Sequence, residues 1–442
     1  MPENSSTHLQ EGITDALTLG WPKTILLGLQ HTFAMFGATV LVPLLTGLSI
    51  QTTLLMAGLG TLLFHLITKG KVPAFLGSSF AFLGGYAAVA PMLPDGSPNE
   101  EMLPYACGGV IFAGLLYIVL AGLIKVFTIE KVMHFFPPVV TGPIIISIGL
   151  ILAPSAIENA KTDWVLALIA LAAIIFFNMW GRGMAKIVPI ILGVLIAYIA
   201  ALLMGKIDFS GIGAEAAVAL PPITLARFDI SAIITIMPIA LATMMEHIGD
   251  ISAIGATTGH NYIANPGLHR TLLGDGLATC LAALFGGPAN TTYGENTGVL
   301  ALTKVYDPRV IRIAACFAIL LSFIPKFAYI IETIPSAIIG GVSLILYGMI
   351  SAVGIRNLVE NHVNFKNTRN TIIAALILVS ALGFNEIGGI TFTVAGTDIN
   401  LSGLAIAAIV GIAANAILPN KDYEFEEEGE EEKFQTYKPY ID

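Results

Sequence analysis

Apolar stretches separated by short polar or glycine- and proline-containing loops recur along the chain from Thr24 to Leu418. Most of them hold roughly 17 to 25 residues, enough for an α-helix to cross a hydrocarbon core about 30 Å thick. The pattern predicts fourteen membrane spans, of which the third, tenth and thirteenth are short. Their approximate limits are 23–47, 51–70, 73–91, 104–126, 134–155, 163–180, 186–205, 229–252, 270–287, 291–304, 309–326, 331–351, 370–384 and 401–418.

The composition agrees with this pattern. Hydrophobic residues make up 55% of the 442 residues and charged residues only 12%, whereas a soluble domain carries about 25% charged residues. The sequence therefore predicts an all-α polytopic protein in the lipid bilayer. Most of the net charge of −9 comes from the acidic run at 424–432, which we expect to hang in the cytoplasm as a solvated tail.

The distribution of Lys and Arg predicts the orientation, because cytoplasmic loops hold an excess of basic residues. Fourteen spans place both termini on one side of the membrane. If that side is the cytoplasm, all but four of the 21 Lys and Arg residues lie at cytoplasmic ends, the exceptions being Lys161, Lys206, Arg227 and Lys326. We therefore expect a multi-pass protein of the cell membrane with both termini in the cytoplasm.

The chain offers no recognisable metal site, disulfide framework or enzyme motif. Cys107, Cys280 and Cys316 lie in apolar surroundings without ligand-like spacing, which favours simple packing. A nucleophile and base at a recognisable spacing and a phosphate-binding loop are also missing from the sequence. We expect no enzyme activity, no cofactor, no metal ion and no nucleic-acid partner.

Two halves of seven spans each would be inverted relative to one another, because an odd number of spans reverses the side of entry. Shifting the chain by 216 residues places residues 30–31 on 246–247 and residues 79–80 on 295–296. Such dipeptide matches are short, and coincidence is the alternative. Their positions in the first, third, eighth and tenth spans favour two inverted seven-span repeats.

The third and tenth spans are the ones most interrupted by glycine, proline and small polar residues, at 73–79 and 286–294. Each fits a short extended piece followed by a half-helix. Corresponding broken segments in inverted halves indicate a binding site near the bilayer midplane, where half-helix N-termini offer unpaired N–H donors. The alternative is that the glycines only permit close helix packing, which does not explain the adjacent Glu295.

Three carboxylates fall inside predicted spans, where each costs about 2.5 to 3.5 kcal/mol to insert. Glu246 and Asp250 lie four residues apart on the eighth span, so both occupy one helix face with Cβ atoms roughly 5 to 6 Å apart. Two carboxylates so close together resist ionising at the same time, which favours a proton site. The alternative for Asp250 is a solvated position at the cytoplasmic end of the helix.

The third carboxylate, Glu295, opens the tenth half-helix, where exposed N–H groups and the positive dipole end favour an acid. A simple helix cap is the alternative. His31 and His247 are candidate proton carriers, although a histidine in a helix bundle often serves only as a hydrogen-bonding residue. Asp275 and His65 have no partner suggested by spacing.

The tenth span contains Glu295-Asn296-Thr297-Gly298 followed by Thr303-Lys304. This motif resembles the tenth-span signature of the nucleobase-ascorbate transporter family, and over residues 21–418 the chain looks most like the uracil branch of that family. Residues 30–43, 76–82 and 340–348 also look like the uracil branch. The resemblance implies a symporter that moves uracil together with a proton.

The resemblance also implies roles for single residues. Glu246 and Glu295 would accept hydrogen bonds from the two ring N–H groups of uracil, while the backbone N–H groups of Phe80 and Gly294 would donate to its carbonyls. The ring of Phe80 could also cover a flat solute, with core packing as the alternative. The candidate substrate-binding residues are Glu246, Glu295, Phe80, Gly294, Ser79, Ala38, Tyr293 and Tyr347, and the candidate proton-coupling residues are Glu246, Asp250 and His31.

Two positions bear on which solute the chain carries. Purine-transporting members of the family typically have glutamine where this chain has Glu295, so a proton-coupled xanthine or urate transporter is the alternative to a uracil transporter. The position of Asp250 is a histidine tied to proton coupling in the uracil permeases that are best known. A carboxylate can also carry a proton, but the pH range of coupling would differ.

The family fold implies two domains that move against each other to give alternating access. A core domain would comprise residues 1–128 and 228–327, a gate domain residues 129–227 and 328–418, and the acidic tail residues 419–442. Gate domains would meet in a homodimer. An anion carrier of the similar sulfate-transporter architecture is less favoured, because its site needs positive charge and this one presents carboxylates, and a channel would show no saturable uptake.

Overall fold

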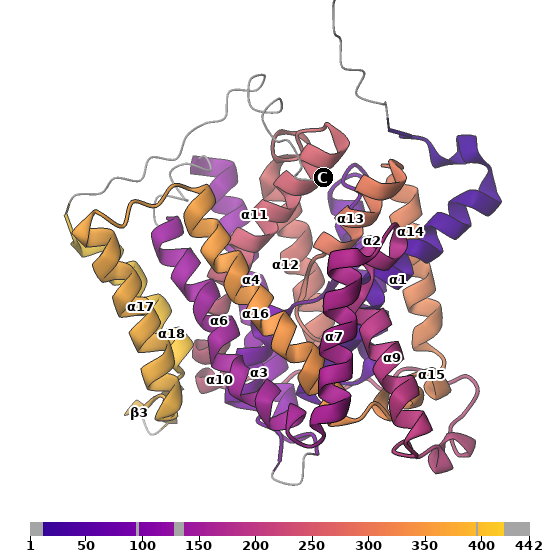
Figure 1. Ribbon diagram of the computed structural model, residues 1–442. Coiled ribbons are helices and arrows are strands. Elements are labelled where there is room, and N and C mark those ends of the chain that lie inside the picture. The colour runs from indigo at the N-terminus through magenta and orange to yellow at the C-terminus, as the bar shows by residue number, and fades with distance from the viewer. Residues whose placement is uncertain (1–11, 94–96, 128–136, 395–396, 420–442) are drawn as a thin grey trace, which may run out of the picture.

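The computed structural model describes residues 12–93, 97–127, 137–394 and 397–419, and most of this part of the chain is helical (Figure 1). The acidic run predicted to form a tail lies outside the described residues. The α-helices are α1 (Trp21–Thr46), α2 (Ile50–Ile67), α3 (Leu83–Val89), α4 (Leu103–Phe127), α6 (Pro138–Ala160), α7 (Trp164–Trp180), α8 (Met184–Ile187), α9 (Pro189–Leu203), α10 (Ile230–Ile236), α11 (Ile239–Thr258), α12 (Leu268–Leu284), α13 (Gly294–Thr303), α14 (Pro308–Ser322), α15 (Pro325–Glu332), α16 (Ser336–Glu360), α17 (Thr368–Glu386) and α18 (Gly403–Ile417).

Local sequence signals set many of the helix ends. A proline in the first turn begins α1, α6, α9, α14 and α15, where its missing N–H costs no hydrogen bond. Side chains of Ser, Asp or Asn accept the first free N–H groups of α2, α7, α10, α14, α17 and α18. Helix α13 and the 3₁₀-helix η2 (Phe80–Phe82) that leads into α3 have no side-chain cap at their N-termini.

The helices are long enough for a multi-pass membrane protein. Seven helices of the described chain can cross a membrane by length and composition, or eight if α14 and α15 form one span bent by 84°. Each predicted apolar stretch contains a helix, but several helices are shorter than a full span. The fold is therefore mostly helical and membrane-spanning, while the count of fourteen spans stays a prediction.

Two short strands join distant parts of the chain. Strand β1 (Leu76–Ser78) pairs antiparallel with β2 (Asn290–Thr292), with Gly77 opposite Thr291. The first crossover is β1 followed by the 3₁₀-helix η2 (Phe80–Phe82) and α3, and the second crossover is β2 followed by α13. The structure thus contains the extended pieces and short helices predicted for the third and tenth spans.

Three features differ from or add to the sequence-based expectations. A hairpin of β3 (Ile390–Val394) and β4 (Thr397–Leu401) connects α17 to α18, and the separate short helix α15 follows the bend after α14. Helix α11 continues to Thr258, beyond the predicted end at residue 252. Asp250 therefore lies well inside its helix, which removes the alternative of a solvated helix end. The remaining short helices are η1 (Ala16–Leu19), η3 (Ser210–Gly213) and η4 (Ile263–Gly267).

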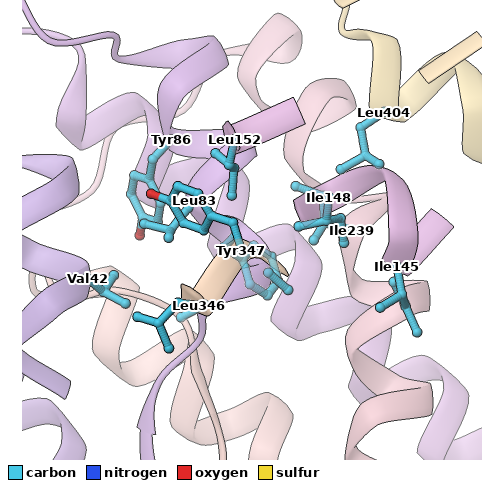
Figure 2. Packing of buried hydrophobic residues seen from close by; sticks show 14 of the residues in the cluster. Val42, Leu83, Tyr86, Ile145, Ile148, Leu152, Ile239, Leu346, Tyr347 and Leu404 are labelled. Atoms are coloured by element: carbon cyan, nitrogen blue, oxygen red, sulfur yellow. The ribbon is translucent and has the colours of Figure 1, made fainter. Parts of the chain in front are cut away.

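The helices pack in groups around one large apolar cluster. Helix α6 packs against α16 and α17, α4 packs against α12, and α14 packs against α1 and α2. The cluster connects α1, α3 and α11 with α6, α16 and α18. Figure 2 shows its members Val42, Leu83, Tyr86, Ile145, Ile148, Leu152, Ile239, Leu346, Tyr347 and Leu404.

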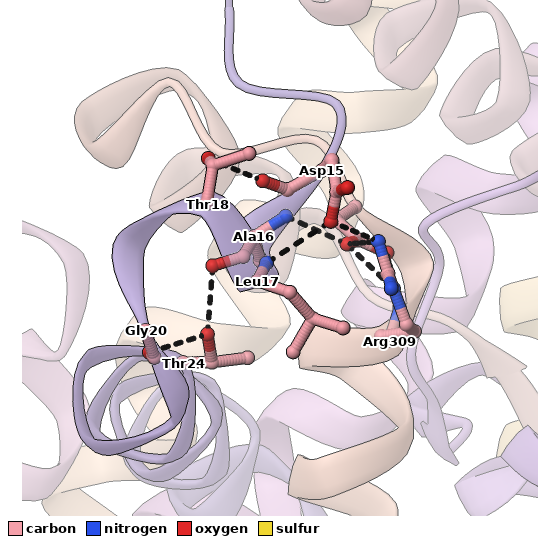
Figure 3. A network of polar contacts seen from close by, with 8 residues as sticks. Asp15, Ala16, Leu17, Thr18, Gly20, Thr24 and Arg309 are labelled. Carbon is pink, nitrogen blue, oxygen red and sulfur yellow. Dashed lines mark hydrogen bonds and ion pairs between the residues drawn. The ribbon is translucent and has the colours of Figure 1, made fainter.

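The N-terminal segment is tied to the loop after α13 and to Arg309 at the start of α14, the second of these contacts being drawn in Figure 3. Backbone hydrogen bonds join Ile13 to Lys304 and Tyr306. The guanidinium of Arg309 forms ion pairs with both Asp15 and the buried Asp307. In Figure 1 the first and the last described residues lie at the same end of the molecule.

Candidate functional site

Side chains lock the two crossovers to each other and to α1. The Tyr293 hydroxyl donates to the Ser78 carbonyl at 2.9 Å and lies 3.3 Å from Thr39 Oγ1. The Ser78 hydroxyl in turn donates to the Thr39 carbonyl at 2.9 Å. Gly77 is required here, because a Cβ at this position would lie 2.5 Å from the Tyr293 ring. Tyr293 therefore belongs to the frame of the site, where its hydroxyl is already engaged.

Four carboxylates gather beside the second crossover, and we call them the acidic cluster. Glu246 and Asp250 come from α11, Asp275 from α12 and Glu295 from the first turn of α13, and all four lie close enough to interact electrostatically. Glu246, Asp250 and Glu295 are half-buried, whereas Asp275 is fully buried. The structure thus brings the predicted carboxylates of the eighth and tenth spans together. In the described part of the chain, no Lys or Arg forms an ion pair with them.

Asp250 is linked directly to the second crossover. Thr292 Oγ1 donates to Asp250 Oδ2 at 2.7 Å, and Thr292 is buried at the end of β2. Thr292 was not among the predicted site residues, since nothing in a polar run such as 290–292 marks which hydroxyl faces a carboxylate. A change in the charge of Asp250 therefore alters a hydrogen bond to the strand that leads into Glu295.

His31 lies at a different place from the acidic cluster. Asn296 Nδ2 donates to both Nδ1 and the carbonyl oxygen of His31, at 3.1 Å each. The imidazole is fully buried, and its Nε2 has no hydrogen-bond partner among the described residues. His31 thus joins α1 to α13 and forms no hydrogen bond with the acidic cluster in the described part of the chain, so its role as a proton carrier stays a prediction.

The two residues without a predicted partner both find one. Asp275 Oδ2 lies 2.9 Å from His247 Nδ1, and both side chains are fully buried. His65 Nε2 bonds to the Ala74 carbonyl at 2.9 Å, which holds the segment just before β1. Sequence spacing could not reveal these contacts, because each joins two different helices or a helix and a loop.

The half-helix N-termini present backbone and apolar groups beside the acidic cluster. Gly294 is exposed, and a Cβ built on it would meet nothing within 4 Å, so open space lies in front of it. Phe80 is half-buried, and Ser79 is buried with no hydrogen-bond partner for its hydroxyl among the described residues. Ala38 and Tyr347 are also buried, and Tyr347 lies in the apolar cluster of Figure 2.

The arrangement suits a small polar solute better than a metal ion. Among the described residues, no group of three or more His, Cys, Asp and Glu side chains is placed to hold a metal. Carboxylate oxygens accept hydrogen bonds, while uncapped helix N-termini donate them. A ligand that both donates and accepts along its edges would satisfy both kinds of group.

Two solved structures with a similar fold come from membrane transporters. The transmembrane domain of the cyanobacterium bicarbonate transporter BicA matches with a TM-score of 0.60 and 16% identity, covering 92% of this chain and 99% of that chain. The murine anion transporter Slc26a9 in the inward-facing state matches with a TM-score of 0.64 and 10% identity, covering 91% and 70%. At these identities the likeness shows the fold alone.

Sequence relatives are much closer. The uracil permease of Bacillus caldolyticus is 41% identical over 424 residues, with 92% of this chain and 94% of the relative covered. The uracil permease of Escherichia coli strain K12 is 40% identical over 407 residues, covering 89% and 91%. A family model described as the permease family matches residues 22–387. The chain therefore belongs to this family of membrane permeases, the nucleobase-ascorbate transporters.

Proposed function

We propose that this permease is a secondary transporter that imports uracil together with a proton. The observation that carries the proposal is that Glu246 of α11 and Glu295 of α13 lie close enough to interact, beside two helix N-termini without side-chain caps, one from each half of the chain. The relatives at 41% and 40% identity are named uracil permeases, which supports the choice of solute.

The hydrogen-bonding edges of uracil match these groups. Its two ring N–H groups would donate to the carboxylates of Glu246 and Glu295, and its carbonyls would accept from the backbone N–H groups of Phe80 and Gly294. The open space at Gly294 leaves room for a ring. A site that pairs all its buried polar groups with one solute rejects analogues that leave a group unpaired.

The coupling ion in this proposal is a proton. Uracil is neutral near pH 7, so the membrane potential cannot drive its uptake unless an ion moves with it. The acidic cluster forms no ion pair with Lys or Arg among the described residues, and a proton lowers the repulsion among its carboxylates. Asp250, held by Thr292, is the residue we assign to carry it.

Asp250→Asn tests the coupling. The variant should still bind uracil and exchange it across the membrane in counterflow, because Glu246 and Glu295 remain. It should lose accumulation driven by an inward pH gradient in proteoliposomes. Accumulation equal to that of the wild type, or uptake driven by a sodium gradient alone, would contradict proton coupling through Asp250.

Several features support an alternating-access architecture. We assign α1 to α4 and α10 to α14 to a core domain, and α6 to α9 and α16 to α18 to a gate domain. The packing of α4 against α12, and of α6 against α16 and α17, supports this division. The antiparallel pairing of β1 with β2 supports two inverted repeats. We further propose that the end with both termini faces the cytoplasm and that gate domains meet in a homodimer.

The second candidate solute is a purine such as xanthine or urate. Competition of labelled uracil uptake by unlabelled uracil, thymine, cytosine, xanthine and hypoxanthine separates the two candidates. Uracil should compete best and xanthine least. Stronger competition by xanthine would favour the purine transporter, and the absence of saturable uracil uptake would remove the proposal. An anion such as bicarbonate is disfavoured because the acidic cluster would repel it.

A further inference from the structure

In each half of the chain, the hydroxyl of one threonine forms two hydrogen bonds with the backbone of the first residue of a crossover strand; we call each such pair of bonds a grip. Thr61 of α2 donates from its hydroxyl to the Leu76 carbonyl at 3.1 Å and accepts from the Leu76 N–H at 2.9 Å. Thr279 of α12 makes the same pair of bonds to Asn290, at 3.0 and 3.2 Å. Both threonines are buried, and Leu76 and Asn290 each open a strand. The two contacts are equivalent in chemistry and in place.

These bonds supply partners for backbone N–H and carbonyl groups on the outer edges of the two-stranded sheet. The N–H and carbonyl groups of Leu76 and Asn290 point to the threonines, whereas Tyr293 N–H bonds to Phe75 and Ser79 N–H bonds to Ala289 across the strand pair. Backbone groups alternate in this way between the partner strand and the outer edge. Within a membrane an unpaired backbone group costs several kcal/mol, so each hydroxyl replaces a missing third strand at one position.

Additional contacts fix the second grip from both sides. The Asn290 amide nitrogen donates to the carbonyl of Met56 in α2 at 3.3 Å and to that of Ala278 in α12 at 3.4 Å. Gly60 makes room for this amide, because a Cβ there would lie 2.2 Å from Asn290 Nδ2. The helices that carry Thr61 and Thr279 are thus also joined to each other through the second strand.

The spacing from each grip to the site is identical. Leu76 lies four residues before Phe80, and Asn290 lies four residues before Gly294. Phe80 and Gly294 carry the backbone N–H groups to which the proposed function assigns the uracil carbonyls. We propose that Thr61 and Thr279 are a matched pair of positioning residues that set the distance between these two N–H donors, an inference that rests on the proposed function.

Valine variants test this role, since valine keeps the shape of threonine and removes the hydroxyl. Thr61→Val and Thr279→Val should each weaken equilibrium binding of labelled uracil to purified protein by about tenfold or more, because displacement of a binding group by about 1 Å is costly. Thr61→Ser and Thr279→Ser keep the hydroxyl and should bind uracil within about threefold of the wild type. Hydrogen exchange at residues 76–82 and 290–296 should be faster in the valine variants only.

Each helix supplies a matched control. Thr53 of α2 and Thr271 of α12 are buried threonines whose hydroxyls bond within their own helix or its cap, to Ser49 and Leu268. Thr53→Val and Thr271→Val should leave uracil affinity unchanged per folded protein. Equal losses in these controls, or unchanged affinity in both Thr61→Val and Thr279→Val, would overturn the inference alone. Failure of the wild type to bind uracil would instead overturn the proposed function and this role with it.

Discussion

The two crossovers share a backbone plan and differ in chemistry. Each is a three-residue strand that is gripped by a threonine of the preceding helix and leads into a short helix without a side-chain cap. The first crossover continues as Ser79-Phe80-Ala81-Phe82, and the second as Tyr293-Gly294-Glu295-Asn296. The common backbone supplies N–H donors from both sides, while the second crossover alone supplies a carboxylate.

The difference indicates a division of labour within one site. Helix N-termini can bind any small acceptor, because they present backbone groups that every sequence has. Selection among nucleobases needs side chains that accept hydrogen bonds, and the second crossover places Glu295 where Glu246 of α11 is close enough to interact with it. The first crossover has no carboxylate at residues 79–82 and contributes the half-buried Phe80.

The largest effect should come from Glu295→Gln. The amide keeps the shape of the carboxylate and one neutral acceptor oxygen, but it replaces the other oxygen with an N–H donor, so one ring N–H of uracil loses its charged acceptor. We expect uracil affinity to fall by about a hundredfold, as measured by equilibrium binding to purified protein. Glu158→Gln changes an exposed glutamate and should bind uracil normally. Wild-type affinity in Glu295→Gln would end the assignment of specificity to the second crossover.

A smaller effect is expected at the first crossover. Phe80→Ala removes a half-buried ring while its backbone N–H remains in place. We predict about a tenfold loss of uracil affinity, since aromatic contacts contribute about 0.5 to 1.5 kcal/mol beyond their buried area. Phe80→Tyr keeps the ring and should bind nearly as well as the wild type. If Phe80→Ala weakens binding more than Glu295→Gln does, the proposed division of labour is reversed.

Much of this fold follows from the sequence because a membrane leaves few options for apolar segments. A stretch such as residues 104–126 can only cross the bilayer as a helix, and it forms α4. The breaks at 73–79 and 286–294 also predicted the crossovers, since glycine and proline disrupt helices. The strands β3 and β4 and the separate helix α15 were not predicted, because each is too short to give a recognisable periodic pattern of apolar residues.

Relations between segments were harder to predict. The sequence shift of 216 residues pairs Ser79 with Glu295, but the first strand residues, Leu76 and Asn290, are 214 residues apart. By strand position, Phe80 therefore corresponds to Gly294. The carboxylates could be placed on their spans from sequence. The contact of His247 with Asp275 and that of Thr292 with Asp250 join separate elements, which a pattern along one chain cannot show.

The far end of the second crossover also distinguishes it from the first. Helix α13 ends at Thr303, and the loop behind it is held by the N-terminal segment through Arg309, Asp307 and Asp15. Burial raises the pKa of Asp307, but hydrogen bonds from Arg309 and from the Ala16 N–H outweigh it and hold the pKa below its ordinary value. Stabilisation by this carboxylate is therefore fully present above the ordinary carboxyl range and is lost as the pH falls through the lowered pKa.

Arg309→Gln should have the smallest effect and leave uracil binding intact. At pH 7 it should make hydrogen exchange of residues 12–19 a few-fold faster, because one partly exposed ion pair with hydrogen bonds is lost. Hydrogen exchange of those amides measures the change, which should shrink as the pH falls below about 4. Lys161→Gln breaks the exposed pair with Glu158 and should change nothing at residues 12–19. A pH-independent effect of Arg309→Gln would show that packing, and not the charge of Asp307, holds the N-terminal segment against the second crossover.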